Sequence, residues 1–353
     1  MLLSDIYLWL AYSQLSTHKL NKLLEAVGPT KLWDSFAGDA KLNLDDKTFS
    51  VLKRTHNEEY IEKVKHYLSI NHIEYVTRAD PLFPESLAER EVDPPFALFY
   101  KGDIYLTRGN NIAVVGTRRA SQYGKYATEK IVRDLASSGF TIVSGLATGI
   151  DGFAHSAALD VGGKTIAVLG SGIFNVTPVS NIALFDKICK DGLVLSEYPP
   201  DVHGSVYTFP QRNRIISGLS KGVLVVEAAE KSGALITADC ALEQGKDVFA
   251  VPGDIDKPRS IGTNKLIKQG GIAVTSANDI LDYYGAASTP KTQTIALDFN
   301  EQRVMDILEG GEATFDALVE KCGLSVAELN TALASLIIHG LIHEKSKNLY
   351  CAS

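Results

Sequence analysis

Apolar residues recur every three or four positions along the first 71 residues, which is the spacing of amphipathic helices. These positions are Ile6, Leu8, Leu10, Leu20, Leu23, Leu24, Val27, Tyr60, Ile61, Val64, Tyr67 and Leu68. A turn at Gly28-Pro29-Thr30 separates two of the runs, and the amides of such a turn can hold a DNA phosphate. A small helical packing domain explains the same pattern, and we prefer that interpretation for residues 1–71.

The next stretch has no helical period and is marked by four prolines, Pro81, Pro84, Pro94 and Pro95. Proline interrupts helices and central strands alike, so residues 72–111 are predicted to form an extended connector that packs on the following domain.

Between residues 112 and 275, short apolar runs alternate with helical stretches. The predicted strands are Ile112–Val115, Thr141–Val143, Thr165–Leu169, Leu193–Leu195, Val223–Val226, Val248–Val251 and Ile272–Val274. The runs are continuously apolar, which is typical of parallel strands buried on both faces. The stretches between them, such as Tyr123–Ser138 and Ala234–Gln244, are long enough for crossover helices. Residues 112–284 are therefore predicted to form an α/β domain with a doubly wound, mostly parallel sheet.

Residues 285–296 are small, polar and proline-containing, and we interpret them as a linker. Residues 297–353 then give three helical stretches followed by two strand-like pieces, Leu341–His343 and Leu349–Cys351. That order predicts a winged helix, with Ser325 as the N-cap of its third helix.

Composition narrows the function classes. The chain is 45% hydrophobic and 22% charged, and its net charge of −7 argues against a protein that coats nucleic acid through general basicity. No apolar run reaches the roughly 18 residues of a membrane span, and the N-terminus lacks the features of a signal peptide. The four cysteines form no CxxC pair, so we expect reduced thiols and a cytoplasmic location, with no disulfide frame.

The residues that directly follow the strands are rich in glycine, serine, threonine and charge. They are Gly116–Arg119, Ser144–Asp151, Gly170–Gly172, Ser196–Pro199, Glu227–Gly233 and Pro252–Asp254. Ligands of open α/β sheets bind beyond the carboxyl ends of the strands. A single glycine there is usually just a tight turn, but six such exits in succession favour a phosphate-binding crevice. Arg118 and Arg119 add forked donors suited to phosphate.

The familiar nucleotide motifs are absent from the sequence. Gly116-Thr117-Arg118 stands where a G-x-G-x-x-G turn would be, and no G-x-x-x-x-G-K-[ST] loop occurs. No His, Cys or Asp cluster has metal-ligand spacing, and His155 is interpreted as a packing or capping residue. We therefore expect no cofactor, no metal and no catalytic residue.

A second basic motif, Phe209–Ser217, reads as a short helix with a proline in its first turn. In one interpretation Arg212 and Arg214 tie this helix to carboxylates such as Glu197 or Glu227. In the other they join Arg118 in the crevice, and Phe209 offers a face for base stacking. The sequence leaves both open.

Taken together, these motifs resemble the DNA-processing protein DprA (Smf) family. The matching stretches are Ile112–Tyr123, Ser144–Leu159, Thr165–Gly172, Ser196–Pro199, Phe209–Ser220, Val225–Thr237 and Phe249–Gly253. One loop departs from the family, because Phe174 and Thr177 precede Pro178 where an Asp and a Tyr are usual.

The resemblance implies a Rossmann-like core between an N-terminal helical domain of the SAM or helix-hairpin-helix type and a C-terminal winged helix. It further implies sequence-independent binding of single-stranded DNA, a homodimer, and delivery of a RecA-type recombinase during natural transformation or DNA processing. By position in the family's motifs, Arg118 and Phe209 would contact DNA, and the pocket would be shaped by Gly116, Ser144, Gly145, Ser232 and Gly233. The full set of predicted DNA-binding residues adds Arg119, Arg212, Asn213, Arg214 and Thr237.

Two alternatives use the same core. A phosphoribohydrolase of the LOG type should show a Pro-Gly-Gly-x-Gly-Thr-x-x-Glu loop, whereas this chain has Lys231–Thr237 there, without the paired glycines or the trailing Glu. A small-nucleotide sensor would need only the crevice. The predicted winged helix holds four basic residues against nine acidic ones, so we expect it to contact protein and not DNA.

Overall fold

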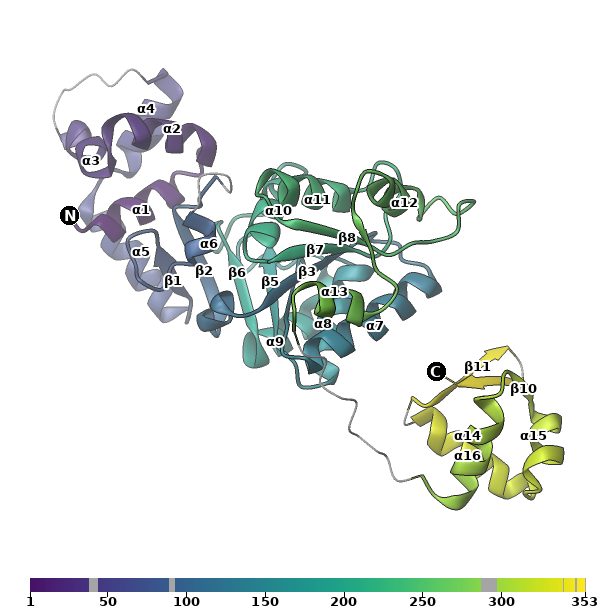
Figure 1. The fold of residues 1–353 in the computed structure, drawn as a ribbon. Coiled ribbons are helices and arrows are strands. Elements are labelled where there is room, and N and C mark those ends of the chain that lie inside the picture. The colour runs from purple at the N-terminus through teal and green to yellow at the C-terminus, as the bar shows by residue number, and fades with distance from the viewer. Residues whose placement is uncertain (38–43, 89–92, 287–296, 339, 347, 353) are drawn as a thin grey trace. The chain divides into compact units, whose positions relative to one another are not determined.

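The computed structural model describes residues 1–353 except 38–43, 89–92, 287–296, 339, 347 and 353. The chain divides into two compact units, Met1–Ser288 and Thr289–Ser353, which are considered separately (Figure 1). Most of the predicted linker at 285–296 falls outside the described residues.

The first unit is built on a nine-stranded sheet of order β1-β2-β6-β5-β4-β3-β7-β8-β9. The strands are β1 (Glu74–Thr77), β2 (Ala97–Gly102), β3 (Asn111–Val115), β4 (Thr141–Ser144), β5 (Thr165–Leu169), β6 (Leu193–Ser196), β7 (Gly222–Val225), β8 (Asp247–Ala250) and β9 (Ile272–Ala273). From β6 to β9 all neighbours are parallel. The chain winds outward from β3 in one direction to β6 and then restarts at β7 on the other side. The doubly wound, mostly parallel sheet is therefore confirmed.

Residues 72–111, where the sequence predicted an extended connector, contribute two strands to this sheet. β2 pairs antiparallel with β6, and β1 pairs antiparallel with β2. Residues 97–100 of β2 are all buried, because the strand lies inside the sheet. Pro81, Pro84, Pro94 and Pro95 all lie outside the strands, in the segment that joins β1 to β2, where a missing N–H breaks no ladder. This segment also contains the short helix α6 (Glu85–Ala88), and the 3₁₀ helix η2 (Ile104–Arg108) follows β2.

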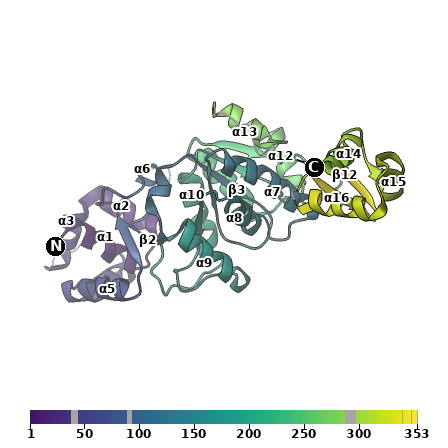
Figure 2. The same ribbon diagram turned by 90° about the horizontal axis from the view of Figure 1, so that it is seen from below.

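Helices cover both faces of the sheet, as Figure 1 shows. They are α7 (Gln122–Ser137), α8 (Ile150–Asp160), α9 (Ile182–Asp191), α10 (Thr208–Gly218), α11 (Gly233–Glu243), α12 (Ile261–Lys268) and α13 (Ala277–Tyr283), with η3 (Val179–Asn181) before α9. Successive residues of a strand point to opposite faces. Ala113 and Val115 of β3 thus pack with α10 and α11, whereas Ile112 and Val114 pack with α7 and α8. Figure 2 shows β3 between α10 on one side and α7 and α8 on the other.

Within the described part of residues 1–71, five helices precede the sheet, as the apolar spacing predicted. They are α1 (Leu3–Tyr12), α2 (Thr17–Val27), α3 (Pro29–Ala37), α4 (Asp46–Thr55) and α5 (Glu58–Ile70). Trp9 is fully buried among them and its indole Nε1 donates to Thr55 Oγ1 at 2.9 Å. The same apolar cluster includes Phe99 of β2, so these helices pack on the sheet. Gly28 ends α2 with a φ of 78°, and α3 begins at once with Pro29.

The second unit consists of α14 (Phe299–Leu308), β10 (Ala313–Thr314), α15 (Phe315–Cys322), α16 (Val326–Ile338), β11 (Ile342–Ser346) and β12 (Leu349–Ala352). The three strands form a sheet of order β10-β12-β11, and the unit has its own apolar core. Ser325 caps α16, because its Oγ accepts from the Glu328 amide and the Glu328 carboxylate accepts from the Ser325 amide. The predicted winged helix is confirmed, and β10 is a third strand that the sequence did not reveal.

Within the described residues, no single helix is both long and apolar enough to cross a membrane. The consecutive helices α15 and α16 meet that requirement together, on length and composition only, but they are bent by 113°.

Candidate functional site

A crevice of about 420 Å³ opens at the carboxyl ends of β3, β4 and β7. Its remaining walls come from α10, the start of α8 and the start of α11. The chain's winding reverses between β3 and β7, so the helix that follows β3 (α7) packs on one face of the sheet and the helix that follows β7 (α11) packs on the other. Such a switch point is where open α/β sheets bind their ligands. The sequence placed the crevice at this edge, and the topology identifies the two strands that create it.

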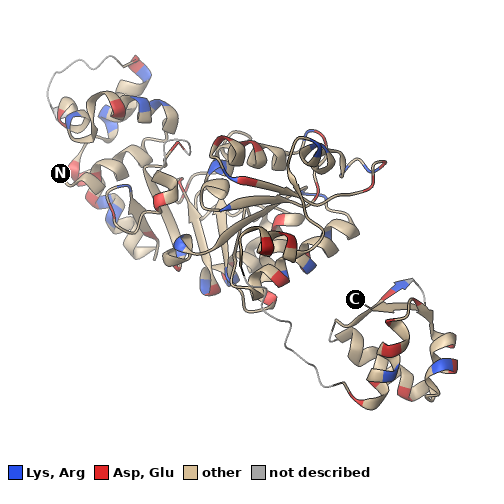
Figure 3. Ribbon diagram, viewed as in Figure 1, with Lys and Arg blue, Asp and Glu red and all other residues tan. Residues whose placement is uncertain are grey.

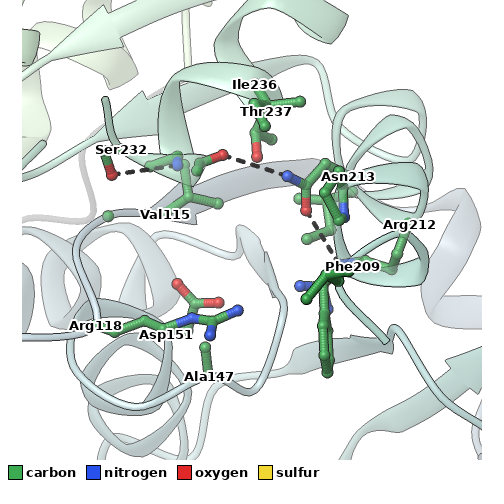
Figure 4. A pocket seen from close by; sticks show the side chains of 16 residues that line it. Val115, Arg118, Ala147, Asp151, Phe209, Arg212, Asn213, Ser232, Ile236 and Thr237 are labelled. Carbon is green, nitrogen blue, oxygen red and sulfur yellow. Dashed lines mark hydrogen bonds between the residues drawn. The ribbon is translucent and has the colours of Figure 1, made fainter. Parts of the chain in front are cut away.

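Eight of the twelve predicted site residues line the crevice. They are Gly116, Arg118, Phe209, Arg212, Asn213, Ser232, Gly233 and Thr237. They come from three stretches separated by up to about a hundred residues of sequence, so only the parallel packing of β3 and β7 brings them together. Figure 4 shows Arg118 on one side of the hollow and Phe209 on the opposite side.

Arg118 is the exposed cation of the crevice. Its guanidinium carbon lies 5.5 Å from the centre of the Phe209 ring, which is cation–π geometry. No hydrogen bond or ion pair engages the Arg118 side chain within the described residues. Its five N–H donors therefore face solvent, ready for a phosphate, beside an aromatic surface on which a base can stack.

The Phe209 ring is held in place by two glycines. A Cβ on Gly170 would come within 2.6 Å of Phe209 Cδ1, and one on Gly204 within 2.7 Å of Phe209 Cζ. Both glycines therefore let the backbone approach the edges of the ring. Seated in this way, the ring offers a fixed face to the crevice.

Arg212 forms part of the floor. It is 5% exposed, and its Nη1 donates to the carbonyl oxygens of Gly145, at 2.9 Å, and of Val168. Gly145 is required here because a Cβ would lie 2.4 Å from the guanidinium. Burial lowers the pKa of Arg212 to about 10, and the neighbouring Asp151 opposes that shift. Two carbonyls already bind this guanidinium, so Arg212 supplies positive potential from below.

Asp151 belongs to the crevice although the sequence analysis did not select it. Its carboxylate is buried in the first turn of α8 and accepts a hydrogen bond from the Gly145 amide at 3.2 Å. Burial raises its pKa, while Arg212, backbone amides and Arg118 act to lower it. An acidic residue just after Gly149, at the start of a predicted helix, was the available signal. Asp151 orders the loop after β4 and balances the charge of Arg212.

The far wall is the N-terminus of α11. Ser232 caps this helix through its Oγ, which accepts from the Ala234 amide at 3.3 Å. The Asn213 side-chain amide donates to the Gly233 carbonyl at 3.4 Å and so joins α10 to α11 (Figure 4). Thr237 follows one turn into α11 and is buried. A helix N-terminus of this kind adds positive potential toward the crevice.

Four predicted residues do not line the crevice. Arg214 points the other way, where its guanidinium forms a two-point ion pair with Glu197 at 2.6 and 2.9 Å. Ser144 is fully buried and its Oγ donates to the Val114 carbonyl. Gly145 lies behind Arg212, and the exposed Arg119 lies beyond the rim of the crevice. Residues two apart on a helix project from opposite faces, which explains why Arg212 and Arg214 separate.

The loop that departs from the family pattern lies elsewhere. Phe174 packs edge-on against Tyr67 of α5 at 6.4 Å and does not line the crevice. His155 is buried, as its interpretation as a packing residue requires, with Nδ1 2.6 Å from Thr165 Oγ1, and burial lowers its pKa to about 3. Within the described residues no group of three or more His, Cys, Asp or Glu side chains is arranged to hold a metal ion.

A family model described as DNA recombination-mediator protein A matches residues 74–285, and one described as DprA winged helix domain matches residues 288–346. Protein Smf of Escherichia coli is 45% identical over 273 residues, which cover 73% of this chain and 72% of that protein. The structure of DNA processing protein A from Streptococcus pneumoniae matches with a TM-score of 0.69 at 38% identity, covering 80% of this chain and 98% of the other.

A further solved structure comes from Helicobacter pylori, and its description concerns the single-stranded DNA binding mode of DNA processing protein A. It matches with a TM-score of 0.54 at 31% identity, and it covers 60% of this chain and 96% of the other.

Proposed function

The chain belongs to the DNA recombination-mediator protein A family, and from that premise we propose that its crevice binds single-stranded DNA without sequence preference. The observation that carries the proposal is the Arg118–Phe209 pair at the switch point of the sheet. A free guanidinium beside a seated aromatic ring holds a phosphate and a base at once. Every base has a π-face and every nucleotide a phosphate, so such a pair is indifferent to sequence.

The residues we propose to contact DNA are the eight that line the crevice, and Arg118 and Phe209 are the principal ones. Arg212 and Asp151 are proposed as positioning residues beneath them. Arg119 is proposed to act at the rim. We assign Ser144, Gly145 and Arg214 to the scaffold, because each already serves a packing or hydrogen-bonding role.

The carboxylates at the carboxyl edge of the sheet fit a protein that binds its ligand better than one that hydrolyses it. The Glu227 carboxylate accepts from the Ser121 amide at 2.9 Å and from the Ser121 hydroxyl, so it is held in a structural contact. Asp151 is buried and bound to a backbone amide. A general acid or base must reach the substrate with a proton to exchange. Neither carboxylate offers that, which argues against the phosphoribohydrolase alternative.

We further propose that the protein acts in the cytoplasm, as a homodimer that delivers a RecA-type recombinase to the bound strand, in natural transformation or DNA processing. The winged helix is proposed as a protein-contact domain. Its acidic residues are spread over α14, α15 and α16 (Figure 3), and such a surface repels the phosphates of a duplex. We also propose that the helical region 1–71, the sheet region and the winged helix are three functional parts.

The decisive experiment is a salt titration of binding to a single-stranded oligonucleotide, with Arg118→Glu alongside the unaltered protein. Each phosphate contact contributes about −0.7 to the slope of log affinity against log salt, so a strand held at several phosphates gives a slope steeper than about −2. Losing one charge-assisted hydrogen bond of about 1.5–3 kcal/mol and adding repulsion should weaken Arg118→Glu about 100-fold.

Lys190→Glu is the matched control, because Lys190 lies in the last turn of α9, toward the amino ends of the strands. It should bind like the unaltered protein. Unchanged affinity of Arg118→Glu would refute the crevice as the DNA site. A slope near that of one phosphate would instead favour the nucleotide-sensor alternative.

A further inference from the structure

A second hollow lies beside the crevice, between the start of α7 and the loop that joins β8 to α12. It has a volume of about 570 Å³. Its walls are Ser121 to Tyr123, Glu227 and the loop from Pro252 to Ser260, and we call it the outer groove. None of its residues was among the predicted site residues.

The crevice and the outer groove share one wall. Gly116 lines the crevice and Glu227 lines the outer groove. The Thr117 amide donates to the Glu227 carbonyl at 2.8 Å, and a Cβ on Gly116 would lie 3.0 Å from that same oxygen. The two hollows are therefore separated only by the backbone that leaves β3 and β7, and a flexible polymer can pass from one to the other over this wall.

Three arginine side chains lie along the route from the crevice over this wall to the outer groove, which we call the passage. Arg118 faces the crevice, and the exposed Arg119 follows it. Arg259 in the wall of the outer groove donates from Nε to the Arg119 carbonyl at 2.7 Å. Within the described residues, no hydrogen bond or ion pair engages the Arg119 side chain or the terminal nitrogens of Arg259. Phosphates spaced along a strand can thus meet Arg118, Arg119 and Arg259 in turn.

The acidic residues of the outer groove do not cancel this row. The Glu227 carboxylate is held by Ser121, as described above. In the loop itself, Asp256 pairs with Lys257 at 3.3 Å. Asp254 remains as an exposed carboxylate on the loop. Ser121 is neutral, so Glu227 keeps its charge, but three arginines against the carboxylates of Glu227 and Asp254 still leave the passage electropositive.

An aromatic ring completes the outer groove. Tyr123 is 49% exposed, and its hydroxyl donates to the Pro252 carbonyl at 2.8 Å. That bond ties the ring to the opposite wall and holds it in one orientation. The outer groove thus repeats the combination found in the crevice, an oriented aromatic ring beside a guanidinium with unengaged terminal nitrogens, those of Arg259. That combination is the recurrent chemistry of single-strand binding.

We propose that a single strand held in the crevice continues into the outer groove, where Tyr123 stacks a base and Arg259 binds a phosphate. The inference rests on the proposed function, since it concerns the path of the same strand. It makes the binding surface longer than the crevice alone. Longer oligonucleotides should therefore bind more tightly than ones that fill only the crevice.

Affinity is measured for oligothymidylates of about 4 and about 16 nucleotides, lengths that bracket common single-strand site sizes. Tyr123→Leu keeps an apolar side chain but removes the stacking face, and it should weaken binding of the long oligonucleotide about tenfold. Binding of the short one should not change. Tyr123→Phe, which keeps the ring, is the matched control and should retain most of the affinity. Arg118→Glu should weaken both lengths.

A photochemical map locates the strand directly. One 5-iodouracil is moved along the long oligonucleotide, irradiated in complex with the full chain, and the linked residue is identified by mass spectrometry. We expect links to Phe209 from one position and to Tyr123 from another position nearby. Equal loss at both lengths in Tyr123→Leu, or no link to Tyr123 from any position, would overturn the outer groove and leave the crevice standing. No binding at either length by the unaltered protein would overturn the proposed function itself.

Discussion

Each of the two units has an arginine over a phenylalanine ring, at the same distance. In the sheet unit Arg118 lies 5.5 Å from the centre of Phe209, and in the winged helix Arg303 lies 5.5 Å from the centre of Phe299. The local chemistry is the same in both. Their surroundings differ, and that difference decides which pair can hold a ligand.

Phe209 is partly buried at the rim of a crevice, with glycines against its edges, above a buried arginine and beside a helix N-terminus. Phe299 is 76% exposed at the first position of α14, next to the capping carboxylates of Asp298 and Glu301. An exposed ring beside carboxylates neither encloses a base nor attracts a phosphate. A residue pair therefore becomes a site only through what surrounds it.

The sharpest way to break this comparison is to remove each ring. Phe209→Ala should weaken binding of a single-stranded oligonucleotide at least about tenfold, because base stacking on an aromatic side chain is worth about 1–3 kcal/mol. Phe299→Ala should change affinity less than about twofold, within the scatter expected of a surface position. Fluorescence anisotropy with a labelled oligothymidylate measures both. Comparable losses in the two variants would show that the surroundings do not matter.

A smaller loss of affinity is expected from a substitution that displaces the Phe209 ring without removing it. Gly170→Ala places a Cβ 2.6 Å from Phe209 Cδ1, so the ring must shift, and affinity should fall several-fold. The test is a double-mutant cycle by the same anisotropy measurement. In a Phe209→Ala background the added methyl group no longer meets the ring, and Gly170→Ala should then have little further effect. Full additivity would mean that Gly170 acts independently of the ring.

The smallest effect should follow removal of residues 289–353. The winged helix has an apolar core of its own, so its loss leaves the sheet unit folded. We expect affinity for a single strand to change less than about twofold, because the acidic winged helix has little attraction for phosphate. Circular dichroism checks the fold of the truncated chain, and anisotropy its affinity. A tenfold loss would assign DNA contacts to the winged helix.

Helical spacing in the second basic motif contained more information than the sequence analysis used. Phe209, Arg212, Asn213 and Ile216 are three or four residues apart, share one face of α10 and all line the crevice. Arg214 lies two residues from Arg212 and therefore projects from the other face, to Glu197. Arg212 therefore fits the interpretation that places it in the crevice, and Arg214 fits the one that ties the helix to a carboxylate. Once the motif is taken as a helix, this division follows from the residue numbers.

The first strand pair could not be anticipated in the same way. β1 and β2 come from a proline-marked stretch, and their pairing joins residues about twenty apart across the intervening prolines. β2 in turn pairs with β6, nearly a hundred residues later. An extended stretch that ends up inside a sheet looks the same in sequence as one that lies against it, because the partner strand is distant in the chain.

The sequence alone determined the buried strands, the crossover helices, the winged helix and the edge of the sheet at which ligand chemistry gathers. These depend on local properties: hydrophobic period, turn residues and caps. The tertiary structure decided that Arg118 lies over Phe209, that Arg212 and Asp151 form the floor, and that the outer groove adjoins the crevice. Those contacts join residues about thirty to a hundred and forty apart, and they exist only because β3 packs beside β7 at the switch point.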